Sequence, residues 1–154
     1  MPEFLDLLSF EVSDPSRQVV VLKERLRYRS RKGTLFTVPA NFETDLASVP
    51  APLRFLAPRW QQCARAGALH DCAYRWYEVW KLDRKRVDRQ FYDALRADGT
   101  GRIRAFGMQS AVRLFGSRAW NRWRRTAAAE KGVRPPPIGG DEPPQPPAAR
   151  ERGT

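Results

Sequence analysis

One short segment, ALHDCAY at residues 68–74, holds the residue types that acid–base chemistry needs. In a helix, His70 and Tyr74 lie on one face at i and i+4, and Asp71 is rotated by about 100° from His70. An imidazole beside a carboxylate can take a proton from water near neutral pH. The segment therefore predicts a water-activating site. The alternative is a partly buried histidine whose nitrogens are satisfied by backbone or carboxylate groups.

A second carboxylate, Asp88, lies on the next predicted helix, over residues 84–97. Asp83 is the expected N-cap of this helix, and Gly99 is expected to end it. The core-facing stripe of the helix is Val87, Phe91 and Leu95. If the two helices pair antiparallel, Asp88 can accept a hydrogen bond from one imidazole nitrogen of His70. That bond would leave the other nitrogen to act as a base.

A proline-bounded loop, VPANFETDLASVP at residues 38–50, precedes these helices. Prolines disfavour a helix just before them, so the segment is expected to be a shaped loop. Its oxygen-bearing side chains are Glu43, Thr44, Asp45 and Ser48. Asp45 and Ser48 either satisfy loop amides or contribute to a site. A serine triad of Ser48, His70 and Asp88 is a weaker hypothesis, because no GxSxG elbow surrounds the serine.

The composition of the 154-residue chain excludes several kinds of site. A single histidine excludes HExxH metalloproteases and other sites that need two or more imidazoles. Two cysteines exclude a disulfide scaffold. The net charge of +11 favours a polyanionic partner, such as nucleic acid, lipid headgroups or an acidic protein.

Residues 101–131 carry eight basic side chains against one acidic side chain, a net charge of +7. We expect one or two helices between Ile103 and Arg125. The predicted polyanion-binding residues are Arg118, Arg122, Arg125, Trp120 and Trp123. Alternatively, the tryptophans pack on the core and the arginines only face water.

The first third of the chain is typical of β-structure. Residues 19–22, 26–30 and 34–38 are predicted strands, and the last two flank a turn at Gly33. Basic residues alternate with apolar ones from Lys23 to Arg31, which predicts one basic strand face, most simply a solvated one. Together these patterns predict an α+β fold, with a small antiparallel sheet followed by three to four helices.

The chain is expected to form one globular domain over residues 1–131. Residues 132–154 are proline-rich and nearly devoid of large apolar side chains, so we expect a disordered tail. No segment has the length and apolarity of a transmembrane helix, and the first residues do not resemble a signal peptide. These features predict a soluble protein that is not exported by the general secretory route.

The two motifs together resemble a phage and prophage family of unknown function, with the signature VPxGFxTDxASVP, then LHDxxY, then DxxF. The resemblance covers about residues 20–116, with Asn41 where the family usually has glycine. Asparagine tolerates a left-handed backbone, so the turn can survive this change. The resemblance implies a phage or prophage origin, hence location in host cytoplasm or a phage particle, and a phage protein as one candidate partner.

A second, local resemblance is to the paired catalytic helices of phospholipase A₂ enzymes. It implies that His70 is the general base, Asp88 orients it and Tyr74 supports the network. It also implies that Asp71 holds Ca²⁺, and Asp45 could add a further oxygen ligand. The chain lacks the glycine-rich calcium loop and the disulfides of those enzymes.

Two functions from different classes follow. The first is a metal-dependent hydrolase with a His–Asp site that acts on an anionic substrate such as lipid. The second is a non-catalytic virion component, or a protein that binds nucleic acid or a protein partner, in which the motifs only stabilise the fold.

Overall fold

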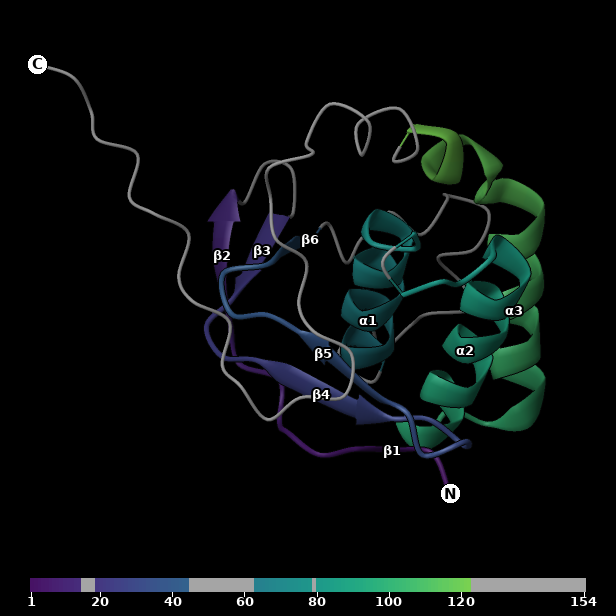
Figure 1. The fold of residues 1–154 in the computed structure, drawn as a ribbon, viewed down its shortest axis with the longest axis horizontal. Helices are drawn as coiled ribbons and strands as arrows, with labels where there is room; N and C mark the ends of the chain where they lie inside the picture. The colour runs from purple at the N-terminus through teal and green to yellow at the C-terminus, as the bar shows by residue number, and fades with distance from the viewer. Residues whose placement is uncertain (15–18, 45–62, 79, 123–154) are drawn as a thin grey trace, which may run out of the picture.

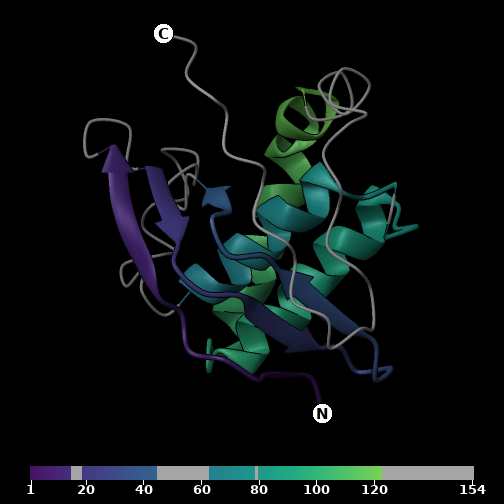
Figure 2. The ribbon, with the colours of Figure 1, turned by 60° about the vertical axis from the view of Figure 1, so that its left-hand side comes forward.

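The strands of the fold precede the helices along the chain. A computed structural model describes residues 1–14, 19–44, 63–78 and 80–122 (Figure 1). One antiparallel sheet has the order β1 (Glu3–Phe4), β4 (Leu26–Arg29), β5 (Leu35–Val38), and a second has the order β2 (Phe10–Asp14), β3 (Val19–Leu22), β6 (Glu43–Thr44). Figure 2 shows the β2–β3 pair standing apart from the β4–β5 pair. The predicted antiparallel strands are therefore confirmed, and they divide between two small sheets.

Three helices follow: α1 (Ala64–Arg75), α2 (Arg84–Ala97) and α3 (Arg102–Phe115). Residues 117–122 are helical as well. The α2 helix packs against both α1 and α3, and α1 also packs against β4 and β5. In Figure 1, α1 accordingly lies between the strands and α2, and α3 lies at the outer edge. The predicted α+β class is confirmed, and the predicted disordered tail lies outside the described residues.

Small side chains let α1 occupy this central place. Ala66, Ala68, Cys72 and Ala73 are all buried, with at most 1% exposure. Short side chains allow the neighbouring elements to approach the helix backbone closely, and Leu69 fills the remaining core volume. As a result α1 has almost no solvent face, and its few polar side chains need partners inside the protein.

The proline-free stretch Trp60–Trp80, rich in Ala, Gln, Arg and Leu, predicts a helix, but α1 ends before Trp80. The helix ends at Arg75, and the chain then turns, with Lys81 in the left-handed region at φ 49°. This turn places Trp80 in a tilted contact with Phe36 of β5, with ring centroids 5.1 Å apart. The turn redirects the chain into α2 and covers the sheet, which a longer α1 would not do.

The basic strand face is paired rather than only solvated. On β4, Leu26 and Tyr28 point into the core, and Arg27 and Arg29 point away from it. Arg27 makes a bidentate ion pair with Asp6, at 2.8 and 2.9 Å, and its backbone N–H donates to the same carboxylate. Arg29 pairs with Glu3 of β1 at 2.8 Å. Acidic residues near the N-terminus thus neutralise much of the charge on this strand.

No helix in the part of the chain that the structure describes is long and apolar enough to cross a membrane.

The N-cap of α2 gives a direct test of the local fold. The Asp83 carboxylate accepts a hydrogen bond from the Arg86 backbone N–H at 2.7 Å. We expect Asp83→Ala to lower the free energy of unfolding by about 1 kcal/mol, because one helix-terminal N–H loses its acceptor. Asp83→Asn keeps an acceptor and should lose much less. Urea unfolding measures both, and equal losses in the two variants would contradict this role.

Candidate functional site

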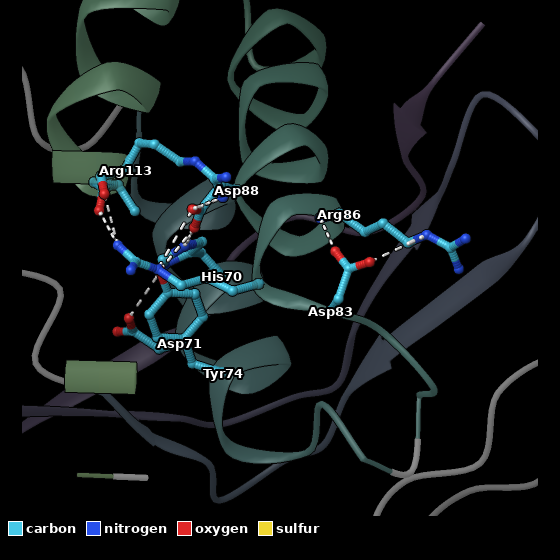
Figure 3. A network of polar contacts seen from close by, with 9 residues as sticks. His70, Asp71, Tyr74, Asp83, Arg86, Asp88 and Arg113 are labelled. Atoms are coloured by element: carbon cyan, nitrogen blue, oxygen red, sulfur yellow. Dashed lines mark hydrogen bonds and ion pairs between the residues drawn. The ribbon is translucent and has the colours of Figure 1, made fainter. Parts of the chain in front are cut away.

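A fully buried carboxylate lies at the centre of the candidate site. Asp88, in the second turn of α2, has an exposure of 0%. A buried charge is costly unless other groups compensate it. The groups that contact the Asp88 carboxylate come from α1, α2 and α3, so this one side chain joins all three helices (Figure 3).

The α1 helix supplies two of these groups, both on one carboxylate oxygen. The Tyr74 hydroxyl donates to Asp88 Oδ1 at 2.7 Å. His70 Nε2 lies 3.4 Å from the same oxygen. The predicted same-face placement of His70 and Tyr74 and the predicted pairing of His70 with Asp88 are therefore what the structure has.

Two arginines face the other carboxylate oxygen. Arg113 Nη1, from α3, lies 3.3 Å from Asp88 Oδ2. Arg84 Nε, one turn earlier on α2, lies 3.7 Å from it. Arg84 also donates from Nη2 to the carbonyls of Val112 and Arg113 at the end of α3, and the Val112 carbonyl also accepts from the Gly116 backbone N–H. Neither arginine is among the predicted site residues, although the i, i+4 spacing of Arg84 and Asp88 is typical of an ion pair on one helix.

The surroundings of His70 define which nitrogen carries the proton. An ionised carboxylate is only an acceptor, so Nε2 must donate to Asp88. Nδ1 then bears the lone pair when the imidazole is neutral. The ring is held between Tyr74 and Phe91, with centroid distances of 4.1 and 4.8 Å. Only 9% of the side chain is exposed, so the imidazole has one defined orientation.

Asp71 lies on the Nδ1 side of the imidazole and is the more open carboxylate. Its Oδ1 is 3.9 Å from His70 Nδ1, which is too long for a direct hydrogen bond. Thr44, at the end of β6, donates from Oγ1 to Asp71 Oδ2 at 2.5 Å. The Asp71 side chain is 31% exposed. The loop motif and the helix motif thus meet here, through a threonine to which the sequence analysis gave no specific role.

The charge states follow from these contacts. Burial disfavours the imidazolium, but the carboxylates of Asp71 and Asp88 outweigh it and raise the pKa of His70. Burial would raise the pKa of Asp88, but hydrogen bonds from His70 and Tyr74 lower it overall. Burial and the nearby Asp88 carboxylate raise the pKa of Tyr74, so its hydroxyl remains a donor.

The end of α3 closes over this network at Gly116. A Cβ at this position would lie 2.9 Å from the Tyr74 hydroxyl and 2.5 Å from the Val112 carbonyl oxygen, so no side chain fits without a shift. Trp120, in the helical residues that follow, packs its ring on Tyr74 and Tyr77 at 4.9 and 4.6 Å. Of the predicted polyanion-binding residues, Trp120 is thus partly buried against the site.

The remaining predicted residues are exposed or lie outside the described part. Arg118 and Arg122 are exposed. Asp45, Ser48, Trp123 and Arg125 lie outside the described residues. Within residues 1–14, 19–44, 63–78 and 80–122, no group of three or more His, Cys, Asp or Glu side chains is placed to hold a metal ion. In the described part, Asp71 and Thr44 are therefore the side chains whose oxygens could serve as metal ligands. Asp45 follows Thr44 directly in the chain.

The raised pKa of His70 predicts how stability depends on pH without added metal. The folded-state pKa lies above the unfolded value of about 6.5, so this group stabilises the fold fully below that pH. Its contribution is lost as the pH rises through the folded-state pKa. Asp88 acts oppositely, since its lowered pKa stabilises the fold above about pH 3.9 and this is lost on acidification.

Because the chain has one histidine, its ring resonance reports this titration without assignment. In buffer with EDTA we expect an NMR midpoint above pH 6.5. The contribution of His70 to the unfolding free energy should fall from about pH 6.5 through that midpoint and level off above it. A midpoint at or below 6.5 would contradict the compensation of the imidazolium by Asp71 and Asp88.

Removal of one donor to Asp88 should cost more than an ordinary hydrogen bond. We expect Tyr74→Phe to lower the unfolding free energy by about 1.5–3 kcal/mol, because the lost donor serves a buried charge. The matched control is Tyr77→Phe, whose hydroxyl donates to the exposed Glu78. Thermal and urea unfolding compare the two, and equal effects would argue against a special role of Tyr74.

Comparisons with known proteins identify the family of this chain and no individual relative. No curated protein and no solved structure gives a significant match. Residues 20–112 match a family described as a protein of unknown function, DUF1353. The match spans β3 to α3 and includes the Thr44, His70, Asp71, Tyr74 and Asp88 cluster. The chain therefore belongs to the DUF1353 family of unknown function.

Proposed function

We propose that this protein is a hydrolase in which His70 activates a water molecule against an ester of an anionic substrate, such as a lipid. Asp88 and Tyr74 orient the imidazole. Asp71 lies beside Nδ1, the imidazole nitrogen that does not contact Asp88, and helps to hold the water molecule there. A phage or prophage origin, with the protein in the host cytoplasm or the phage particle, is part of the same proposal.

One observation carries the proposal: His70 is held between two carboxylates that differ in burial. Asp88 is sealed and accepts from Nε2, whereas Asp71 is 31% exposed and lies 3.9 Å from Nδ1. When the imidazole is neutral, Nδ1 and Asp71 are both acceptors, and their lone pairs repel each other across 3.9 Å. Protonation of the imidazole relieves this repulsion, and so does a water molecule that donates to both groups. A water held in this way is positioned for activation.

The chemistry then follows from the geometry. His70 Nδ1 takes one proton from water as the water oxygen forms a bond to the carbonyl carbon of the ester. Asp88 stabilises the resulting imidazolium through Nε2. The tetrahedral intermediate breaks its bond to the leaving oxygen, and the imidazolium returns the proton to that oxygen. The products are a carboxylic acid and an alcohol, and His70 is neutral again.

A divalent cation, with Ca²⁺ the best candidate, fits the donor chemistry on the Asp71 side. The Asp71 carboxylate is a hard oxygen ligand, as Ca²⁺ prefers, and Asp45 would supply a second. When bound, Ca²⁺ would polarise the carbonyl and stabilise the oxyanion. The Thr44 hydroxyl holds Asp71 Oδ2, so it would fix the orientation of this ligand.

A specific observation favours a second candidate, a non-catalytic binding protein. The His70–Asp88 network joins three helices, and His70 is only 9% exposed, as expected for a structural role. The two candidates predict different results for the substitution of Asp71, whose carboxylate is partly exposed.

The test measures fatty-acid release from phosphatidylglycerol vesicles by the full chain, with millimolar CaCl₂ or with EDTA. We expect His70→Gln to lower the rate by about 10²–10⁴-fold, because the general base is lost. Asp71→Asn should lower the rate and weaken Ca²⁺ binding in calorimetry. Both variants should remain folded in the assay, with no cooperative unfolding transition below the assay temperature.

The matched control is Glu78→Gln, which removes an exposed carboxylate just beyond α1 and should leave the rate unchanged. Folded Asp71→Asn protein with unchanged Ca²⁺ binding, together with no hydrolysis by the wild type, would assign the motif to the second candidate.

A further inference from the structure

We infer that the outer face of α3 is a docking surface for an anionic lipid membrane. This surface, here called the α3 outer face, consists of Ile103, Phe106 and Leu114 with the flanking Arg102, Arg104 and Arg113. Of these six residues, Arg113 also contacts the Asp88 carboxylate of the site. The inference holds whether or not the site is hydrolytic.

The apolar side chains of this face are far more exposed than is usual for their size. Ile103 is 91% exposed, Leu114 72% and Phe106 64%, and Phe115 at the helix end is 51% exposed. By the helical rotation of about 100° per residue, the first three fall within roughly 80° of one another. They lie opposite the buried face of α3, which is Ala105, Met108 and Ala111.

Among the residues that the structure describes, no element packs over this face of α3. The helix packs against α2 and forms the outer edge of the described part (Figure 1). Gly107 and Ser110 lie between Phe106 and Leu114 on this face, so the face is apolar at both ends of the helix. Several large apolar side chains exposed on one helix face mark a site that binds something apolar. The occupant must therefore offer an apolar region.

The charge on this face identifies the occupant further. The three flanking arginines are exposed, and Arg118 and Arg122 continue the positive charge along the chain. No acidic residue occurs between positions 99 and 122. A surface with exposed apolar side chains between cationic side chains matches the boundary between anionic headgroups and acyl chains.

Two other occupants fit this face less well. A second copy of the chain would bring the same arginines against one another, and like charges repel at such an interface. A nucleic acid would pair with the arginines but would gain nothing from Ile103 and Leu114, since base stacking needs aromatic faces. An anionic membrane uses both kinds of side chain.

The experiment is co-sedimentation of the full chain with vesicles of phosphatidylcholine, with and without phosphatidylglycerol. We expect binding to the anionic vesicles that weakens with added NaCl, and little binding to phosphatidylcholine alone. The double variant Phe106→Ser with Leu114→Ser should bind about tenfold more weakly or worse, because two inserting side chains are lost. Arg102→Gln with Arg104→Gln should also lose about tenfold, from the headgroup attraction.

Matched controls separate this face from general effects. Leu7→Ser removes an exposed leucine elsewhere, with 85% exposure, and should bind as the wild type does. Lys23→Gln with Lys32→Gln removes the same charge from exposed sites in the strand region and should lose much less than the arginine pair. His70→Gln should bind vesicles normally, which distinguishes docking from hydrolysis.

Three results would overturn the inference. The first is wild-type affinity of the Phe106→Ser, Leu114→Ser variant for anionic vesicles. The second is a dimer in velocity sedimentation that this variant abolishes, which would assign the face to a second copy. The third is tight binding to a DNA duplex, lost with the arginines but not with Phe106 and Leu114, without binding to vesicles.

Discussion

The burial of one charged carboxylate constrains the arrangement of the whole helical half. Asp88 has no exposure, and a charge in that position is tolerated only while its hydrogen bonds are made. Its partners sit on α1 and α3 as well as on α2, so the helices cannot shift relative to one another without exposing an uncompensated charge. Apolar packing alone would allow several helix arrangements of similar energy, whereas this network favours one.

Much of this arrangement could be predicted from local patterns. The spacing of His70 and Tyr74, the cap at Asp83 and the stripe through Phe91 each depend on helical periodicity, which the sequence displays directly. The contact of His70 with Asp88 needed one further assumption, that consecutive helices pair antiparallel. These predictions are correct because they concern neighbours in sequence or adjacent elements.

The contacts that could not be predicted from the sequence depend on long-range packing. Thr44 and Asp71 are 27 positions apart, and no local pattern selects the threonine from the other oxygen-bearing residues of its loop. Arg113 reaches Asp88 only because α3 packs on α2 with a particular rotation. The basic face of the strand was likewise predicted to be solvated, because no local pattern shows that Asp6 and Glu3 lie beside its arginines in the fold. An excess of charge in a sequence therefore overstates the charge that a surface presents.

The central position of α1 has a consequence for motion. Because α1 packs against β4 and β5 on one side and against α2 on the other, we expect its amide protons to be among the slowest of the described residues to exchange with solvent. The imidazole of His70 therefore lies on a helix that we expect to open rarely in the native state. Thermal fluctuations of the native state will therefore displace His70 very little, and any mobility needed for a ligand to enter must come from the elements around it.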